Sequence, residues 1–174
     1  IAPPSNALPA TLADPNSTRH APMPIRQATA ADATAISQLI LSLCHFFTLD
    51  PGGKGAEGFM QSLTPQAIAA LIASPSFSYS LAEEDGQLLG VVAMRDHSHL
   101  YHLFVAQAQQ RQGIATRLWQ HARQHAITAG NPQRISVNAT LYAQPIYEHF
   151  GFRASGPKVE TKGIVFVPMQ LLLS

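Results

Sequence analysis

The spacing of apolar residues predicts a domain that combines helices with strands. After the helix-capping residues 29–32, a run that ends at Phe47 carries apolar side chains at the three- and four-residue spacing of one buried helix face. The side chains on that face are Ile36, Leu39, Ile40, Leu43 and Phe47. Three further helices are expected, over residues 64–73, over residues 114–129, and over a short segment that ends near 150–151.

Short apolar runs between these helices predict the strands. Asp85-Gly86 separates two such runs and is typical of a two-residue hairpin turn. The expected strands cover residues 25–28, 78–83, 87–94, 99–105, 134–138, 152–155 and 164–172. The order β-α-α-β-β-β-α-β-α-β-β indicates a mixed α/β fold.

Composition narrows the class of protein. The 174 residues suit one core with one appendage, and a charged fraction of 12% with 46% hydrophobic residues excludes a charge-rich disordered chain. Eleven basic residues nearly balance ten acidic ones, so nucleic acid is not an expected partner, and the single cysteine, Cys44, forms no intrachain disulfide. No run of apolar residues has the length of a membrane span, and no secretory leader is evident, so a cytoplasmic protein is expected. Because the chain begins at Ile1 and not at Met, the sequence leaves open whether a leader has been removed.

The first 24 residues differ from the rest of the chain. They contain six prolines among small and polar residues, a composition that resists both helices and central strands. We therefore predict an extension over residues 1–24 and a domain over residues 25–174. The sequence leaves open whether the extension is a disordered tail or a segment that lies over the fold.

The segment Gln110-Arg111-Gln112-Gly113-Ile114-Ala115-Thr116 lies between an expected strand and an expected amphipathic helix. Successive backbone N–H groups at such a turn, together with the positive end of the helix dipole, favour a phosphate or pyrophosphate. Gly113 and Ala115 keep bulky side chains away from those amides. The segment is neither a Walker loop nor a Gly-x-Gly-x-x-Gly motif, and alone it also fits an ordinary turn.

Other motifs accompany this loop in a fixed order. Leu103-Phe104-Val105 precedes it, Asn138 ends the strand that follows the helix, and Tyr147-Glu148-His149-Phe150-Gly151-Phe152 comes next. This pattern resembles the GNAT superfamily of acetyl-CoA-dependent N-acetyltransferases, in which (Arg/Gln)-x-x-Gly-x-(Gly/Ala) starts a helix and Tyr-x-x-x-Gly-Phe follows later. The resemblance covers about Ile25 to Leu173. It implies a mixed, mostly antiparallel central sheet with a splayed strand pair, flanked by helices.

The resemblance also implies a cofactor site for acetyl-CoA as cosubstrate. The residues that match the pyrophosphate loop are Gln110, Arg111, Gln112, Gly113, Ile114, Ala115 and Thr116. Main-chain groups of Phe104 and Val105 match the positions that pair with the pantetheine arm, and the side chain of Asn138 matches one that reaches the same arm. The alternative for Asn138 is a strand-end residue that satisfies its own backbone.

Tyr147 matches the family tyrosine near the thioester sulfur, where a phenol of pKa about 10 can protonate the departing thiolate. The alternative is a core aromatic residue. An amine of pKa about 10.4 must lose a proton before it attacks, and many family members use a glutamate for this. This chain has no carboxylate at the matching positions, which leaves His99 or solvent as the base. On a regular strand His99 and His102 face opposite sides, so only one of them faces the site.

These residues predict an N-acetyltransferase that moves the acetyl group of acetyl-CoA to a primary amine of a small molecule or protein, by direct attack in a ternary complex. The alternative is an acyl-CoA-binding sensor or scaffold domain with little catalysis. No metal is expected, since the strand histidines near His97 lack an obvious third ligand. The loop 50–59 lies where the family builds its acceptor pocket, and a solvated loop is the alternative. Homodimers that form through the last strands are common in such folds, and no particular residue of this sequence argues for one.

Overall fold

A computed structural model describes residues 23–174. The proline-rich extension expected over residues 1–24 lies outside this range except for Met23 and Pro24. Within residues 23–174, no helix is long and apolar enough to cross a membrane.

An eight-stranded sheet forms the centre of the domain, in the order β1-β2-β3-β4-β5-β8-β6, and β7 pairs with β8 off this path. The pair β4–β5 is parallel, and the other pairs between neighbouring strands are antiparallel. The strands are β1 (Ile25–Gln27), β2 (Phe77–Glu84), β3 (Gln87–Arg95), β4 (His99–Val105), β5 (Arg134–Ala139), β6 (Arg153–Ala154), β7 (Val159–Thr161) and β8 (Ile164–Leu172). This arrangement confirms the mixed, mostly antiparallel sheet.

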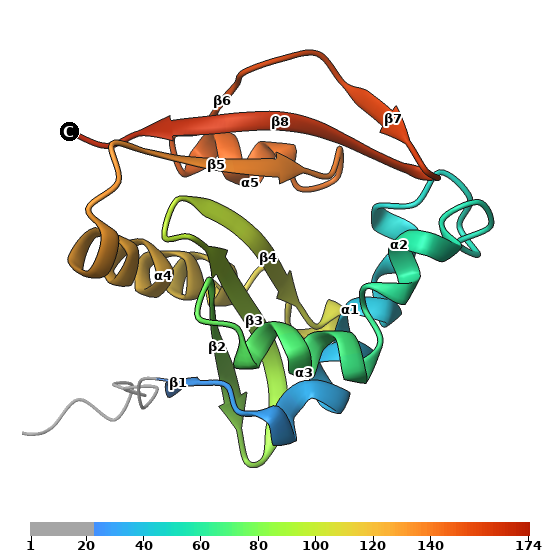
Figure 1. Ribbon diagram of the computed structural model, residues 1–174, viewed down its shortest axis with the longest axis horizontal. Helices are drawn as coiled ribbons and strands as arrows, with labels where there is room; N and C mark the ends of the chain where they lie inside the picture. The colour runs from blue at the N-terminus through green and yellow to red at the C-terminus, as the bar shows by residue number, and fades with distance from the viewer. Residues whose placement is uncertain (1–22) are drawn as a thin grey trace, which may run out of the picture.

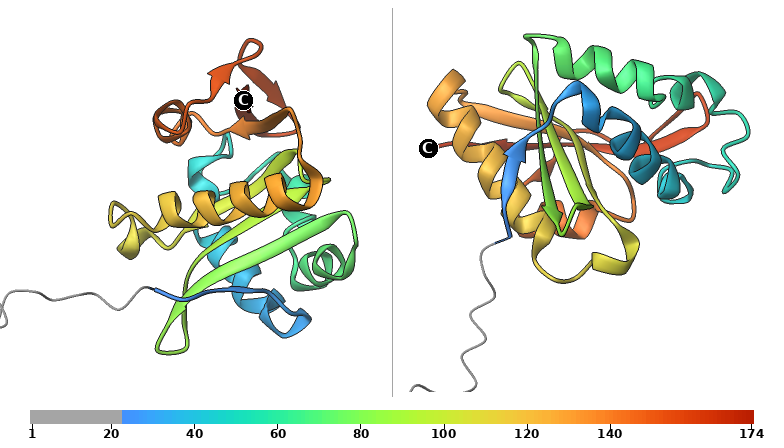
Figure 2. Two further views of the ribbon diagram at one scale, coloured as in Figure 1. Left: turned by 90° about the vertical axis from the view of Figure 1, so that its left-hand side faces the viewer. Right: turned by 90° about the horizontal axis from the view of Figure 1, so that it is seen from below.

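Helices flank the sheet on both faces (Figures 1 and 2). Helix α4 packs on β3 and β4, and α1 and α3 pack on each other over the opposite face of the same strands. The helices are α1 (Ala33–Ser42), α2 (Glu57–Gln61), α3 (Pro65–Ala73), α4 (Ile114–Gly130) and α5 (Gln144–His149), with short 3-10 turns η1 (Ala30–Asp32), η2 (Cys44–Phe46) and η3 (Gln107–Gln109). Thr64 caps α3 by accepting a hydrogen bond from the N–H of Ala67, as the Thr-Pro start predicts.

Two apolar clusters hold these layers together, one on each face of the sheet. The cluster under α4 and α5 contains Leu118, Trp119 and Phe152, and the cluster under α1 and α3 contains Ile36, Ile40 and Ile68. In each cluster, the apolar side chains on one side of each helix are buried against the strands. This burial of apolar surface is the main contribution to the stability of the fold.

The expected elements agree with the structure except in three places. The helix expected to end at Phe47 ends at Ser42, because Leu43 leaves the helical region (φ −105°, ψ 7°) and the chain continues as η2. Leu43 and Phe47 are nevertheless buried, so the apolar spacing persists through the change of helix type. Helix α2 lies in a region interpreted as loop, and β7 is an additional short strand paired with β8.

An ion-pair cluster ties β1 to the rest of the sheet. The guanidinium of Arg26 donates to Asp32 Oδ1 and to Glu83 Oε1, each at 2.8 Å. The N–H of Thr29 also donates to Asp32 Oδ2 at 2.7 Å. The bonds from Arg26, and next that from Thr29, hold the pKa of Asp32 at about 2, below its ordinary value of 3.8.

We therefore expect the variant Asp32→Asn to unfold at a lower temperature than the wild type at pH 7, by about 2–4 °C because solvent screens the partly exposed pair. Because the pKa of Asp32 is lower in the folded state, the ionised carboxylate stabilises the fold above pH 3.8. This contribution is lost as the pH falls through about 2. The difference between wild type and variant in thermal melts must therefore shrink toward pH 2. The exposed neighbour Glu84, changed to Gln, is the control; an equal loss in both variants would contradict a specific role for Asp32.

Candidate active site

Strands β4 and β5 begin side by side and then separate. Their parallel pairing is confined to His99 with Ser136 and Leu100 with Val137, although β4 continues to Val105 and β5 to Ala139. Figure 1 shows the two strands diverging beyond these pairs. The expected splayed strand pair is therefore present, and a pocket of about 600 Å³ lies at the opening.

The pocket reaches both faces of the sheet. Ala93 pairs with His102 and Met94 with Leu100, so Tyr101 is an extra residue that forms a β-bulge in β4. Beyond the bulge, the side chain of Leu103 packs with the cluster under α4, and that of Phe104 packs with the cluster under α1. Both residues line the pocket, which therefore joins the α4 side of the sheet to the α1 side.

The same bulge changes the expected directions of two histidines. His102 is buried on the α1 side, where its Nδ1 lies 3.1 Å from the Tyr79 hydroxyl. The Nδ1 of His99 lies 2.8 Å from Ser136 Oγ, and Ser136 alternates with β5 residues that are buried under α4. Both histidines therefore face the α1 side, whereas a regular strand predicts opposite faces. Burial lowers the pKa of His102 to about 3 and lowers that of His99, and neither residue lines the pocket.

The sequence leaves His99 or solvent as the base, and the position of His99 outside the pocket lining favours solvent. We expect His99→Asn, whose amide can still bond Ser136, to change kcat/KM by less than about threefold, because loss of a general base costs ~100-fold or more. Steady-state rates from pH 6 to 9 check this. A loss of that larger size, with the acidic limb of the profile removed, would restore His99 as the base.

The loop before α4 exposes backbone amides to the pocket. Arg111 (φ 63°) and Gly113 (φ 80°) adopt the left-handed conformation, and Gly113 accepts the first helical hydrogen bond, from the N–H of Arg117 at 3.1 Å. No side chain of residues 23–174 caps this helix. The N–H groups of residues 114–116 consequently have no partner in the described part of the chain, and these residues line the pocket. Free amides at the positive end of a 17-residue helix have the chemistry that suits an anion.

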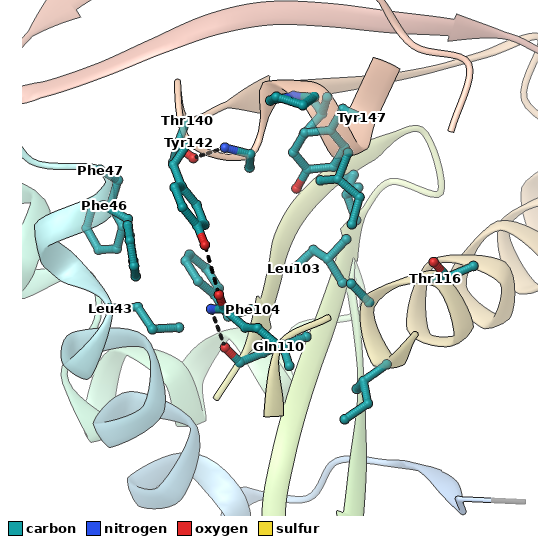
Figure 3. A pocket seen from close by; sticks show the side chains of 18 of the residues that line it. Leu43, Phe46, Phe47, Leu103, Phe104, Gln110, Thr116, Thr140, Tyr142 and Tyr147 are labelled. Atoms are coloured by element: carbon teal, nitrogen blue, oxygen red, sulfur yellow. Dashed lines mark hydrogen bonds between the residues drawn. The ribbon is translucent and has the colours of Figure 1, made fainter. Parts of the chain in front are cut away.

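Tyr147 is positioned by α5 at the wall of the pocket. Its side chain is 5% exposed and packs against Phe150 and Phe152 in edge-to-face geometry. The hydroxyl has no hydrogen-bond partner within residues 23–174 and points into the pocket (Figure 3). Burial raises its pKa, so the phenol stays protonated at neutral pH and is a donor rather than an acceptor of protons.

The structure brings most of the residues singled out in the sequence to this one pocket. Those that line it are Phe104, Val105, Gln110, Arg111, Gly113, Ile114, Ala115, Thr116, Asn138 and Tyr147. Gln112 is exposed on the loop and, like His99, is absent from the lining. Asn138 extends from β5, where its backbone pairs with Pro168 of β8.

A chain of contacts across the opening was not expected from sequence. The Tyr142 hydroxyl donates to Gln110 Oε1 at 3.0 Å, and Gln110 Nε2 donates to the carbonyl of Val105 at 3.1 Å (Figure 3). The Tyr142 ring stacks on Phe46, with centroids 4.2 Å apart. Tyr142 follows β5 in an irregular segment and is 54% exposed, so neither periodicity nor a motif marks it. The free carbonyl expected at the end of the splayed strand is thus occupied by Gln110.

The charge of the pocket comes from one side. Among the described residues, Arg111 lines the pocket beside the start of α4, and neither a carboxylate nor a histidine belongs to the lining. Among residues 23–174, no group of three or more histidine, cysteine, aspartate or glutamate side chains is arranged to hold a metal ion.

The sequence matches the family model described as "Acetyltransferase (GNAT) domain" over residues 47–173. The chain belongs to the GNAT acetyltransferase family. It is therefore an N-acetyltransferase of that family, as the motifs indicate, while the family match leaves the acceptor undetermined. None of the curated proteins has a matching sequence.

Solved structures of other N-acetyltransferases share the fold of this chain. A GCN5-related N-acetyltransferase from Rhodopseudomonas palustris has a TM-score of 0.72 and 16% identity, covering 87% of this chain and 96% of its own. The PaiA N-acetyltransferase from Thermoplasma acidophilum, solved with coenzyme A, has a TM-score of 0.68 and 12% identity, covering 87% and 99%. An aminoglycoside 6'-N-acetyltransferase, also with coenzyme A, has a TM-score of 0.65 and 14% identity, covering 86% and 97%. At these identities the likeness shows the fold alone.

Proposed function

We propose that this protein transfers the acetyl group of acetyl-CoA to a primary amine of a small molecule or protein, by direct attack within a ternary complex. The observation that carries the proposal is the pocket between β4 and β5. In the part of the chain that the structure describes, this pocket combines the uncapped amides of α4 with a Tyr147 hydroxyl that has no partner, and it opens to both faces of the sheet. A cofactor can therefore enter on the α4 side and an acceptor on the α1 side.

The residues present fit coenzyme A. The amides of residues 114–116 and the guanidinium of Arg111 suit the pyrophosphate, and a Cβ built on Gly113 meets nothing within 4 Å, which leaves the space before the amides free. The main chain of Phe104 and Val105 and the side chain of Asn138 suit the amides of the pantetheine arm. For Val105 this requires Gln110 to leave its carbonyl.

Bound acetyl-CoA supplies an acetyl thioester. The acceptor nitrogen forms a bond to the acetyl carbon, the carbon–sulfur bond breaks, and the Tyr147 hydroxyl gives its proton to the departing sulfur. The strand amide near Val105 polarises the acetyl carbonyl, and the amine proton leaves to solvent, from which Tyr147 is reprotonated. The elevated pKa of Tyr147 keeps it protonated before the reaction.

Calorimetric titration of the wild-type protein with acetyl-CoA, followed by competition with coenzyme A, tests the cofactor half of this proposal. We expect one site per chain with micromolar affinity, and coenzyme A competing for it. Absence of heat with a folded sample would remove acetyl-CoA from the proposed function.

A further inference from the structure

The α1 side of the pocket is formed by apolar and aromatic side chains from three separate parts of the chain. We call them the acceptor wall: Leu43, Phe46, Phe47, Phe104 and Tyr142. Phe47 meets the edge of Phe104, with centroids 5.9 Å apart, and Phe46 stacks on Tyr142. Figure 3 shows these side chains across the pocket from Tyr147. When an acceptor presents its amine to the Tyr147 side of the pocket, the rest of the acceptor molecule therefore lies next to this wall.

No carboxylate faces this wall from the described part of the chain. The nearest acidic residues in sequence, Asp50 and Glu57, accept backbone N–H bonds within their own loop, Asp50 from Gly52 and Glu57 from Gly55. The remaining acidic side chains of residues 23–174 are likewise absent from the lining: Asp32, Glu83, Glu84, Asp85, Asp96, Glu148 and Glu160. An acceptor with a second ammonium group would bury that charge without a counter-charge.

Cation–π attraction replaces the missing carboxylate only in part, because stacking covers one face of each ring in the Phe46–Tyr142 pair. An ammonium ion binds to an open aromatic face. Phe46 and Tyr142 stack on each other with an interplanar angle of 27°, so each covers a face of the other, and Phe47 presents to Phe104 at 65°. The acceptor wall thus offers apolar contact area more than an aromatic cage.

The lining also restricts the basicity of the amine. Within residues 23–174, no imidazole or carboxylate that could remove a proton belongs to this lining. At pH 7.5, an alkylamine of pKa about 10.4 is neutral in roughly one molecule per thousand, whereas an α-amine of pKa about 7.8 is neutral in roughly a third. An amine that arrives neutral needs no base within the pocket.

We propose that the acceptor is a weakly basic amine, such as an α-amine, carried on an uncharged apolar body of aromatic size; this inference depends on the proposed function. Its amine reaches the Tyr147 side of the pocket, and its body packs on the acceptor wall. Diamines, polyamines and amines of small polar molecules are poor acceptors.

Four amines separate the two properties: L-phenylalaninamide is apolar and weakly basic, glycinamide is small and weakly basic, phenethylamine is apolar and strongly basic, and putrescine is dicationic. With saturating acetyl-CoA, we expect kcat/KM to be highest for L-phenylalaninamide, at least about tenfold above glycinamide because a benzyl group is buried. We expect phenethylamine to gain on L-phenylalaninamide as the pH rises from 7 to 9, and putrescine to be the poorest.

The variant Phe46→Glu places a carboxylate in the acceptor wall, and Leu49→Glu places one on an exposed residue of the same segment that does not line the pocket. We expect Phe46→Glu to lower the ratio of kcat/KM for phenethylamine to that for putrescine by at least about tenfold, and Leu49→Glu to leave it unchanged. A wild-type preference for putrescine or glycinamide would overturn the inference and leave the proposed function intact. Binding of acetyl-CoA without acetylation of any of the four amines would likewise overturn the inference, whereas absence of acetyl-CoA binding would overturn the proposed function.

Discussion

The variant Tyr147→Phe is expected to lower kcat for acetyl transfer by roughly 100-fold or more, with the affinity for coenzyme A almost unchanged. The variant keeps the ring that packs against Phe150 and Phe152 and loses only the hydroxyl that points into the pocket. Because that hydroxyl has no partner in the described residues, its removal leaves no buried group unsatisfied, and the melting temperature is expected to stay near that of the wild type. Initial rates, calorimetry and thermal melts give the three values.

The pH dependence of the wild type supplies a second readout. The pKa of Tyr147 lies above its ordinary value of 10, so the acid form persists throughout the neutral range. We therefore expect no loss of kcat that follows deprotonation of a phenol between pH 7 and 9.

The matched control for Tyr147→Phe is Tyr79→Phe. It removes another buried hydroxyl, one that bonds His102 outside the pocket. If both variants lose activity equally, Tyr147 has no special chemical role.

The variant Gly113→Leu is expected to weaken binding of coenzyme A by at least about 100-fold, because hydrogen bonds from free amides to a charged group are among the stronger ones and the new side chain would stand before them. A Cβ at this position meets no protein atom within 4 Å, so the effect on binding does not come from a clash within the protein. A leucine in the left-handed conformation (φ 80°) still costs stability, about 1–2 kcal/mol. Calorimetry with coenzyme A and a thermal melt measure the two effects separately.

Gly86 offers a matched control for this strain. It also has a left-handed conformation (φ 76°) with nothing within 4 Å of a built Cβ, and it lies in the β2–β3 hairpin, apart from the pocket lining. The variant Gly86→Leu is expected to lose a similar amount of stability and to bind coenzyme A like the wild type. Unchanged affinity in Gly113→Leu would show that coenzyme A binds elsewhere.

The sequence predicts the fold where local signals and burial agree. The residues from 99 to 105 form β4 as expected, and α4 begins at Ile114 directly after the glycine. The start of α3 is equally well marked by Thr64-Pro65. These elements combine a strong local start signal with a clear apolar period, so local preference and tertiary packing favour the same conformation.

The differences arise where apolar spacing does not distinguish between conformations. Leu43 and Phe47 are buried whether the chain is α-helical or 3-10, so their spacing does not reveal that α1 ends at Ser42. The bulge at Tyr101 depends on how β3 and β4 align, which a single strand does not encode. That bulge places His99 and His102 on the same face of the sheet. His99 lies outside the pocket lining because it stands at the start of β4, where β4 is still paired with β5.

The cofactor side of the site was more accessible to sequence reasoning than the acceptor side. Gly113 and Tyr147 belong to the short motifs that carry the resemblance to the GNAT superfamily. Phe46 and Tyr142 meet only because η2 and the segment after β5 fold against each other. Contacts between residues so far apart in the chain leave no local pattern, which is why the acceptor wall and the Tyr142–Gln110–Val105 contacts required the structure.

Acetyl transfer from acetyl-CoA to an amine is tested most directly by measuring both products of one reaction. Purified protein is incubated with acetyl-CoA and L-phenylalaninamide, and free coenzyme A and the N-acetylated amine are quantified by chromatography with mass detection. We expect one N-acetylated amine for each coenzyme A released, and much less of both products with Gly113→Leu. Tight binding of acetyl-CoA with no N-acetylated amine, from this amine or from the other three, would contradict acetyl transfer to such amines and favour an acyl-CoA-binding domain instead.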